Sequence, residues 1–370
     1  MKTIVVIGAT GHFGARICRR LLGEPDIRLI VTSRSAPRAE SFSRELREAA
    51  SNTVVIGTAL DQFAPDFERK LSKLEPDVVV HTAGPYQGQD YRVAEACIQC
   101  GSHYVDLADG RDFVLGFSRL DAAARRRDVL LVSGASTLPG LSSAVVDFLE
   151  DRFDRIHAIR ISIAPAHQTP RGQGTIAAVL SYCGKPFEVL SDGKRVTMHG
   201  WQNFEMQHYP FGTRLSAACD VPDLVLLPDY VSQVRTVTFH AALEAGWEQV
   251  ALWLMAWLTR LRIVRDWSPA VPLFQRIGRR LVRWGSDTGG MHVGLSGIGE
   301  NGGLRSVNWY LTARQNHGPE IPCTPALIIT RKLVTEQLSM TGARPCLGLI
   351  TMSEFDAEVD DLDIEWQVSE

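Results

Sequence analysis

Three closely spaced glycines near the N-terminus are the residues whose pattern points most directly to chemistry. They lie in GATGHFG, residues 8–14, between an apolar β-branched run at residues 3–7 and a run with helical spacing at residues 15–22. A strand that turns this tightly into a helix needs residues without a Cβ, because the backbone must bend sharply and approach a pyrophosphate. The unpaired amides and the dipole at the helix start favour that anion. The turn predicts a dinucleotide site made by Gly8, Thr10, Gly11, His12, Phe13 and Gly14, and a plain strand–turn–helix is the alternative.

The loop after the second predicted strand distinguishes the two nicotinamide dinucleotides. An enzyme that uses NAD carries an acidic residue there, which accepts hydrogen bonds from the free ribose 2′-hydroxyl. This sequence instead reads IVTSRSAPR, so that Ser33, Arg34 and Arg38 offer hydroxyl and guanidinium donors. A planar guanidinium suits a phosphate, and we therefore expect NADP. The alternative is that both arginines are solvated surface residues.

The loop after the fourth predicted strand reads HTAGPYQGQDY. We expect the backbone of Thr82, Ala83 and Gly84 to lie close to the nicotinamide ribose. Tyr86 then points into or near the reaction site.

Two further loops hold candidate contacts to the cofactor. Asp61 could reach the adenine end, although a carboxylate at the start of a helix also serves as a cap. Ser136, or its neighbour Thr137, could contact the nicotinamide amide, and helix capping is again the alternative.

Hydride transfer requires mainly that donor and acceptor are aligned in a dry pocket, with a proton source for the acceptor. Tyr86 and Asp106 are the candidate catalytic residues, because each lies on a loop or strand end that faces the cofactor. A carboxylate in such a place also caps turns without any catalytic role. His81 and His167 are further possible acids. The Tyr-x-x-x-Lys pair that protonates a carbonyl oxygen in short-chain reductases is absent from the sequence.

Six short apolar runs, separated by helical patterns, must position these residues. Such alternation implies right-handed crossovers and a parallel sheet, and six strands predict a doubly wound α/β fold. Ligands of these sheets bind at the carboxyl ends of the strands, where the candidate loops begin. The runs are residues 3–7, 27–32, 53–56, 77–82, 104–107 and 129–132.

Several segments resemble the saccharopine dehydrogenase-like family. They are GATGHFG, HTAGPYQGQ and ACIQCGSHYVDLADG, in which Asp106 matches the family's YVD stretch, and later GQGTIAAVL and GPEIPCTPALIITRKL. The resemblance implies a doubly wound parallel Rossmann sheet, an inserted second α/β or α+β domain for substrate and dimerisation, a homodimer, and NADP-linked oxidoreduction. The expected divisions are an NADP-binding domain at residues 1–140 completed by 320–345, a substrate and dimerisation domain at 141–319, and a C-terminal strand or tail at 346–370.

The second half holds one more candidate anion site. The segment TPRGQGTIAAVL places Arg171 and two glycines ahead of a helix, which repeats the arrangement of the opening turn. It could hold a substrate carboxylate or a cofactor phosphate, with a solvent-exposed turn as the alternative. We also expect strands at residues 156–163 and 305–313, a helix at residues 324–338 and a final edge strand in the acidic tail.

Residues 247–285 are both apolar and basic. They contain seven arginines against Glu248 and Asp266, an excess of 7 - 2 = 5 positive charges. The longest uncharged run is far shorter than the roughly 18 residues that a membrane span requires. Leu273, Ile277, Leu281 and Trp284 recur at helical spacing, whereas Arg276, Arg279, Arg280 and Arg283 take other faces. The segment could contact an anionic membrane or receive a long acyl substrate, and a helix packed on its own core with a solvated basic side is the alternative.

Composition limits the remaining possibilities. The net charge of -3 argues against a nucleic-acid partner, and the N-terminus has neither a signal-peptide core nor a cleavage site, so we expect a cytoplasmic protein. Seven scattered cysteines do not form a disulfide pattern. Cys97 and Cys100 form a lone C-x-x-C without a second ligand pair, and we expect buried cysteines on a helix face and no metal site.

These observations predict an NADP-dependent oxidoreductase. The expected reaction is hydride transfer to an imine or an activated double bond of a small or lipid-like substrate. An imine acceptor is already protonated, so the reaction does not require the absent Tyr-x-x-x-Lys pair. The alternative is a catalytically silent NADP(H)-binding sensor or scaffold.

Overall fold

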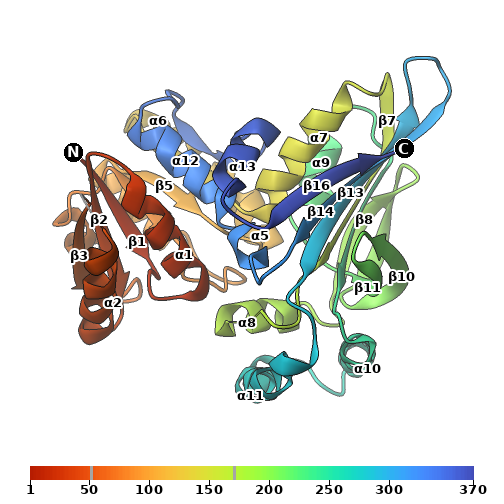
Figure 1. The fold of residues 1–370 in the computed structure, drawn as a ribbon, viewed down its shortest axis with the longest axis horizontal. Coiled ribbons are helices and arrows are strands. Elements are labelled where there is room, and N and C mark those ends of the chain that lie inside the picture. The colour runs from red at the N-terminus through yellow and green to blue at the C-terminus, as the bar shows by residue number, and fades with distance from the viewer. Residues whose placement is uncertain (51–52, 170–171) are drawn as a thin grey trace. The chain divides into compact units, whose positions relative to one another are not determined.

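The computed structural model describes residues 1–50, 53–169 and 172–370. The chain divides into two compact units, which we call the parallel-sheet unit, residues 1–140 with 320–350, and the mixed-sheet unit, residues 141–319 with 351–370 (Figure 1). Both units are discontinuous in the sequence. The tail expected at 346–370 is shared, because its first five residues, 346–350, belong to the parallel-sheet unit and the rest belongs to the mixed-sheet unit.

A seven-stranded sheet, in which every neighbouring pair is parallel, forms the centre of the first unit. The strand order is β15-β6-β5-β4-β1-β2-β3, so the chain switches direction between β1 and β4, the place where such sheets bind ligands. All six predicted strands are present, and β15 adds a seventh. Their bounds are β1 Lys2–Ile7, β2 Ile27–Ser33, β3 Val54–Ala59, β4 Val78–His81, β5 His103–Asp106, β6 Leu130–Ser133 and β15 Gly342–Pro345.

The central strands are buried on both faces, as their uninterrupted apolar runs predict. Residues 4–6 of β1 and 78–80 of β4 have no exposed surface. The outer strand β3 instead alternates at its start between exposed and buried residues. Burial therefore places the core of this unit along β1 and β4, directly beneath the switch point.

Helices cover this sheet and close the unit. They are α1 His12–Arg20, α2 Ala36–Ala49, α3 Phe67–Ser72, α4 Arg92–Cys100, α5 Arg111–Leu115, α6 Asp121–Arg126 and α12 Thr324–Val334. The helix α12 packs against β4 and β5, and Arg331 ties it to Glu24. It ends at Val334 and not at residue 338, because Glu336 takes a left-handed φ of 57° and the Gln337 amide donates to the Lys332 carbonyl at 2.8 Å.

The two cysteines of the C-x-x-C lie on α4, where Cys97 is buried and Cys100 is half-buried. Both thiols are free, and burial raises the pKa of each. They are therefore protonated at neutral pH, as expected for cysteines that pack on a helix face.

The mixed-sheet unit is built on nine strands. Their order is β10-β11-β12-β7-β13-β14-β16, with β8 paired to β12 and to β9, and β7 and β12 run parallel whereas the other pairs are antiparallel. The strands expected at 156–163, at 305–313 and in the tail are β7, β14 and the edge strand β16. The bounds are β7 Arg155–Ala164, β8 Pro186–Ser191, β9 Lys194–His199, β10 Gln202–Tyr209, β11 Gly212–Ala218, β12 Thr236–Ala242, β13 Gly289–Ile298, β14 Leu304–Ala313 and β16 Ile364–Ser369.

The helices of this unit are α7 Ser142–Glu150, α8 Gln173–Ser181, α9 Asp223–Tyr230, α10 Gly246–Arg260, α11 Val271–Leu281 and α13 Met352–Val359. The capping box of Thr351 and Glu354 begins α13. Across the described parts of both units, no helix combines the length and apolar character that crossing a bilayer would take.

Candidate functional site

The glycine turn lies at the carboxyl end of β1, and its backbone leaves no room for side chains. Gly8 takes a φ of 81°, and a Cβ there would lie 2.9 Å from the Thr82 hydroxyl oxygen. A Cβ on Gly14 would overlap the carbonyl oxygen of Gly8 and lie 2.6 Å from the same hydroxyl. The turn is closed by the Gly11 amide, which donates to the Gly8 carbonyl at 2.8 Å. Two of the three glycines are thus required by close packing of β1, α1 and the end of β4.

The first turn of α1 offers free backbone donors at this place. Gly11 is the N-cap residue, and within the described chain no side chain caps this end and its first turn holds no acidic residue. The amides of residues 12–14 precede the first intrahelical hydrogen bonds, so they remain available to an anion. Arg16 stands one turn later, but its guanidinium is engaged by Glu320 at 3.0 Å and by the His12 carbonyl at 2.8 Å.

The end of β4 is held beside the glycine turn. Both the amide and the hydroxyl of Thr82 donate to the Ile7 carbonyl, each at 2.9 Å. These two hydrogen bonds fix Thr82 and Ala83 across the switch point from Gly8. The structure therefore brings together five predicted cofactor residues from two loops, namely Gly8, Gly11, Gly14, Thr82 and Ala83.

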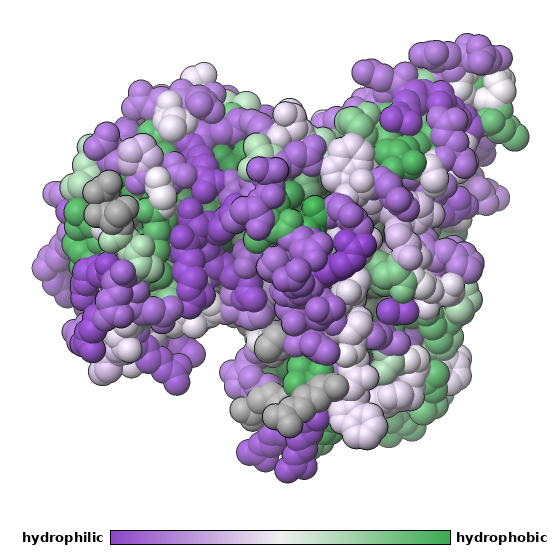
Figure 2. Space-filling view, in the orientation of Figure 1, coloured by the Kyte–Doolittle hydropathy of each residue, from purple (hydrophilic) through white to green (hydrophobic). Residues whose placement is uncertain are grey.

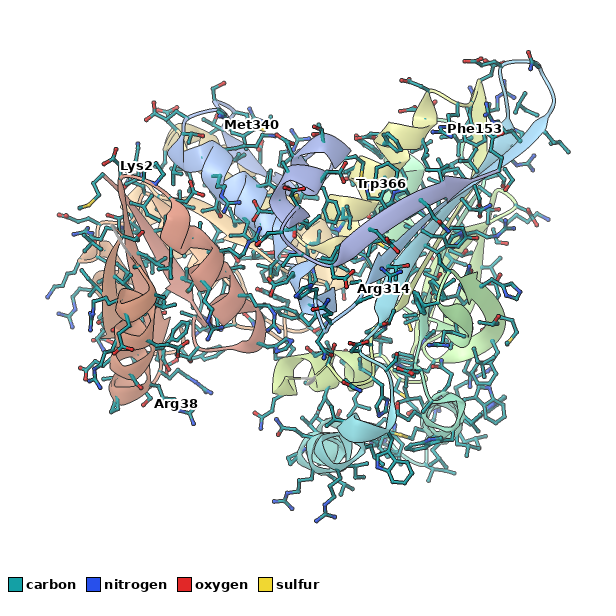
Figure 3. The ribbon with its side chains drawn as sticks, viewed as in Figure 1. Lys2, Arg38, Phe153, Arg314, Met340 and Trp366 are labelled. Atoms are coloured by element: carbon teal, nitrogen blue, oxygen red, sulfur yellow. The ribbon has the colours of Figure 1, made fainter. Side chains whose placement is uncertain are left out.

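The end of β2 carries two unpaired cations. Arg34 and Arg38 are exposed, and no hydrogen bond or ion pair of the described residues engages either guanidinium. Figure 3 shows Arg38 at the end of the unit opposite to Lys2, which begins β1. Ser33, the last residue of β2, accepts a hydrogen bond from the Ser35 amide at 3.3 Å. Free guanidinium groups at the carboxyl end of this strand suit a 2′-phosphate on the adenosine ribose.

The capping alternative is wrong for Asp61. Its carboxylate accepts from the Phe63 amide at 3.0 Å and closes a turn, and α3 begins only at Phe67. Ser136 is buried and stands directly before the π-helical turn Thr137–Leu141, which leads into α7, so both alternatives for it stay open. Their contacts to the cofactor stay predictions.

The structure contradicts the placement predicted for Tyr86. Its side chain is buried, and its hydroxyl donates to the His81 carbonyl at 2.6 Å. The ring packs against His81 and Phe113, with centroids 5.4 and 5.3 Å away, and burial raises its pKa well above the ordinary value. Tyr86 therefore stabilises the loop after β4 and does not present a proton to an open site.

Asp106 is likewise buried, and its Oδ1 is engaged within the fold. Its Oδ1 accepts from the Gly134 amide at 2.8 Å, the Ala108 amide at 2.9 Å and the Ser133 hydroxyl at 3.1 Å. Burial raises its pKa to about 6, and these donors act in the opposite direction. The carboxyl group ties the end of β5 to the loop after β6, so we correct its assignment from catalytic to positioning residue.

His81 cannot serve as an acid in this structure. Burial lowers its pKa to about 3, so the ring is neutral at physiological pH. Its Nδ1 lies 3.0 Å from the Tyr104 hydroxyl and its Nε2 lies 2.9 Å from Oε1 of Gln62. His167 belongs to the mixed-sheet unit, where its Nε2 lies 3.0 Å from the Leu281 carbonyl oxygen and joins two segments of that unit.

Sequence reasoning missed two glutamines that shape the loop after β4. The Gln89 amide group donates to the Ala83 carbonyl at 2.9 Å and to the Pro85 carbonyl at 2.6 Å. Gln62, on a different loop, donates to Gln89 at 3.4 Å. The only signal for Gln89 was its place in GPYQGQDY, and Gln62 had none, because its partners are far away in the sequence.

The family model described as the saccharopine dehydrogenase NADP binding domain matches residues 4–130. Over these residues the chain resembles the saccharopine dehydrogenase NADP binding domain. The matched range contains the glycine turn, the arginines after β2 and the loop after β4, and the cofactor of this site is NADP.

One solved structure supports the two-domain α/β fold of the chain. The apo saccharopine dehydrogenase (L-Glu forming) from Saccharomyces cerevisiae matches with a TM-score of 0.70 and 12% identity, over 100% of both chains. An amine dehydrogenase from Mycobacterium smegmatis matches with a TM-score of 0.48 and 11% identity, over 94% of this chain and 95% of that chain. No curated protein matches the sequence significantly.

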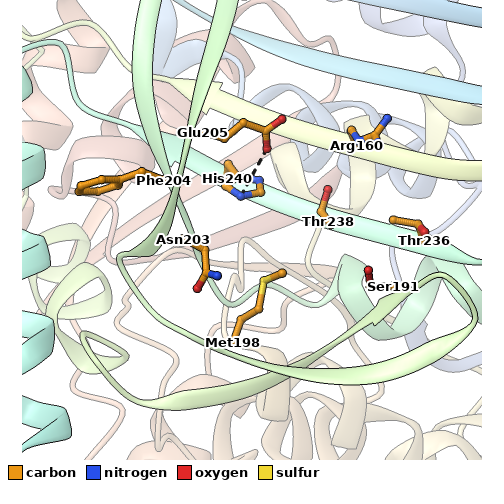
Figure 4. A pocket seen from close by; sticks show the side chains of 9 residues that line it. All are labelled: Arg160, Ser191, Met198, Asn203, Phe204, Glu205, Thr236, Thr238 and His240. Carbon is orange, nitrogen blue, oxygen red and sulfur yellow. Dashed lines mark ion pairs between the residues drawn. The ribbon is translucent and has the colours of Figure 1, made fainter.

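The mixed-sheet unit contains a pocket of about 380 Å³ (Figure 4). Within it, the carboxylate of Glu205 lies 3.6 Å from Nε2 of His240, and Arg160 stands on the neighbouring strand β7. Burial lowers the pKa of His240, whereas the Glu205 charge opposes that shift. Sequence reasoning missed this pocket because its lining comes from five strands that are separate in the sequence. The lining residues are Arg160, Ser191, Met198, Asn203, Phe204, Glu205, Thr236, Thr238 and His240.

The second predicted anion site includes Arg171, which lies outside the described residues. The helix α8 begins after Gly172, its N-cap.

Proposed function

We propose that this chain is an NADP-dependent oxidoreductase that transfers a hydride to an imine or an activated double bond of a small or lipid-like substrate. The observation that carries the proposal is the glycine turn at the switch point, combined with free Arg34 and Arg38 at the end of β2. NADPH supplies the hydride when it is bound. The chain's own residues hold the pyrophosphate on the amides of residues 12–14 and the 2′-phosphate on the two guanidinium groups.

The burial of the polar residues near the switch point favours a hydride acceptor that needs little acid catalysis. The two candidate proton donors are both buried: Tyr86 donates its hydroxyl to the His81 carbonyl, and Oδ1 of Asp106 accepts a hydrogen bond from the Gly134 amide. His81 is held neutral by burial, which lowers its pKa. An iminium acceptor already carries its proton, so transfer to it requires only alignment and exclusion of water.

The cofactor part of the proposal is tested by fluorescence titration with NADPH and NADH. We expect NADPH to bind more tightly, because only its 2′-phosphate engages the two arginines. The double variant Arg34→Ala with Arg38→Ala should weaken NADPH binding roughly 10- to 100-fold, the loss expected for charge-assisted hydrogen bonds, and leave NADH nearly unchanged. The matched control is Arg126→Ala, an exposed arginine on α6. Equal binding of both nucleotides, or of neither, would remove the proposal.

A catalytically silent NADP(H) sensor or scaffold is a second candidate. The burial of Tyr86, Asp106 and His81 favours it, because no proton donor among them faces an open site. The two candidates differ in turnover. Consumption of NADPH, followed by its absorbance with imines formed from 2-oxo acids and amines and with enoyl thioesters, would support the enzyme. Tight NADPH binding without turnover of any of them would support the sensor.

A further inference from the structure

The helix α10 has one apolar face that the described chain leaves uncovered. Large apolar side chains recur along it and its C-cap with the spacing i, i+3, i+7, i+10 and i+14, which places them on a single stripe. They are between 36 and 62% exposed. The stripe consists of Trp247, Val250, Leu254, Trp257 and Leu261. The buried residues Gln249, Leu252, Met255 and Ala256 take the opposite face, so the helix is anchored to its own unit by that side.

The segment after α10 and the helix α11 extend the exposed apolar surface. Ile263, Leu273 and Ile277 are exposed, and Trp284 is 86% exposed. This contradicts the interpretation of α11 as a helix whose apolar side is packed on the core. In Figure 2, green and pale side chains gather at the place that α10 occupies in Figure 1. We call the stripe together with Ile263, Leu273, Ile277 and Trp284 the α10–α11 surface.

The two helices are joined within the mixed-sheet unit. His167 lies between them, with Nδ1 3.7 Å from the Glu248 carboxylate of α10 and Nε2 3.0 Å from the carbonyl oxygen of Leu281, which ends α11. In addition, the Trp267 indole, which lies between the helices in sequence, donates to the Thr259 hydroxyl of α10 at 2.9 Å. These contacts hold α10, α11 and the segment between them together, so we treat the α10–α11 surface as one continuous surface.

The charge of this segment is strongly positive. Residues 247–285 contain seven arginines and only two acidic residues. Glu248 is largely buried beside His167, and Asp266 accepts hydrogen bonds from the amide and hydroxyl of Ser268 at 3.0 and 2.8 Å. Among the described side chains, Arg260, Arg262, Arg265, Arg276 and Arg280 are exposed, and Arg260 donates to the side-chain oxygen of Gln202 at 2.7 Å. The side chains of Arg279 and Arg283 lie outside the described residues.

We propose that the α10–α11 surface docks on an anionic membrane. Exposed leucine and isoleucine can enter the acyl boundary, tryptophan suits the headgroup level, and the flanking arginines can bind lipid phosphates. At 15 residues, α10 is too short to span a bilayer and lies in the plane of the interface. A second copy of the chain is a poorer occupant, because two surfaces with this excess of positive charge would repel each other. The proposal goes beyond hydride transfer and does not depend on it.

The first test is co-sedimentation with vesicles. The full chain should sediment with an equal mixture of phosphatidylglycerol and phosphatidylcholine, should remain in the supernatant with phosphatidylcholine alone, and should be released by added salt. The double variant Arg276→Glu with Arg280→Glu should weaken binding about tenfold or more. Its matched control is Lys194→Glu with Arg195→Glu on the exposed β8–β9 hairpin, which makes the same change in charge.

The apolar part of the surface is tested separately. Leu254→Ser with Leu261→Ser should weaken vesicle binding on the order of tenfold, because two inserted leucines are lost. The control is Leu304→Ser, which replaces a leucine that is 90% exposed on β14. Thermal melting by circular dichroism should be unchanged in all variants, since each replaced side chain is exposed.

Three results would overturn the proposal. They are absence of binding to anionic vesicles, equal binding to anionic and neutral vesicles, and binding that is reduced neither by the double arginine variant of α11 nor by the double leucine variant. Sedimentation velocity addresses the other occupant. If the wild-type chain is a dimer that Leu254→Ser with Leu261→Ser dissociates, and no vesicle binding is seen, the surface joins two copies and the membrane proposal fails.

Discussion

Gly14 is the most constrained residue of the cofactor turn. It has an ordinary backbone conformation, so its need for glycine comes from space and not from φ. The carbonyl oxygen of Gly8, the Thr82 hydroxyl and the backbone of Ala9 all stand where a Cβ would lie. Gly14 therefore allows β1, α1 and the end of β4 to pack closely at the cofactor turn.

Replacing Gly14 by alanine should therefore damage both stability and binding. The added methyl would lie 2.6 Å from the Thr82 hydroxyl oxygen, and such overpacking costs about 1–3 kcal/mol. We expect a lower melting temperature and weaker NADPH binding, measured by scanning fluorimetry with and without NADPH. Gly23→Ala is the control, because nothing lies within 4 Å of a Cβ there. A Gly14→Ala chain that melts and binds like the wild type would show that the turn is less tightly packed than described.

Tyr86 and Asp106 show the limit of reasoning from residue type. The sequence identified both as groups able to donate protons, and their places after β4 and β5 were predicted correctly. It could not show that Tyr86 turns its hydroxyl to the His81 carbonyl or that three donors meet Asp106. Those contacts join residues that are up to 28 positions apart, so local sequence carries no record of them.

At the scale of elements, strands with long apolar runs were predictable and β15 was not. Its sequence, GARP, contains a glycine and a proline and no apolar run. It forms a strand only because β6 offers a parallel partner, with Ala343 opposite Leu131. The pairing, and not the intrinsic preference of the residues, makes it a strand.

The helices α7 and α9 are linked by a buried carboxyl group. Asp223, the first residue of α9, has no exposed surface and accepts a hydrogen bond from the hydroxyl of Ser142, the first residue of α7. Burial raises the pKa of Asp223 to about 7, and the Ser142 hydroxyl opposes this shift. The folded state thus holds this proton more tightly than the unfolded chain does.

This shift predicts a pH dependence with a definite sign. Because the folded pKa lies above the ordinary one, the contribution of Asp223 is favourable at low pH and is lost as pH rises through about 7. Between pH 5 and pH 8 the loss is on the order of 2–3 kcal/mol. Asp223→Asn, which cannot ionise, should raise stability relative to the wild type more at pH 8 than at pH 5, as measured by melting temperature. A difference that is equal at both pH values would contradict a buried, protonated Asp223.

At the scale of the whole molecule, the chain leaves the parallel-sheet unit at Gly140 and returns at Glu320. The first crossing point lies beside the start of the returning helix α12, because a Cβ on Gly140 would lie 3.0 Å from the Cβ of Pro325. The returning segment provides α12 and β15, and most residues of α12 are buried. The N-terminal 140 residues alone therefore lack part of their own core.

This arrangement predicts which fragment can bind NADPH. Residues 1–140 joined to 320–350 by a short Gly/Ser linker should fold and bind NADPH, because the linker replaces the mixed-sheet unit at a place where Gly140 lies beside the start of α12. Residues 1–140 alone should not, because β4 and β5 would lose the helix that packs on them. Isothermal titration calorimetry of both fragments provides the measurement. Binding by residues 1–140 alone at the affinity of the joined fragment would show that α12 is dispensable.

The sequence by itself determined the parallel sheet, the glycine turn, the two arginines after β2 and hence NADP, because each depends on residues that are neighbours in the chain. The tertiary structure decided which of these residues are accessible. It buried Tyr86, Asp106 and His81, assembled the pocket of Figure 4 from five strands, and left the stripe of α10 exposed. The physical reason is that exposure and pairing depend on contacts between residues far apart in the sequence, whereas strand, turn and helix patterns depend on spacing alone.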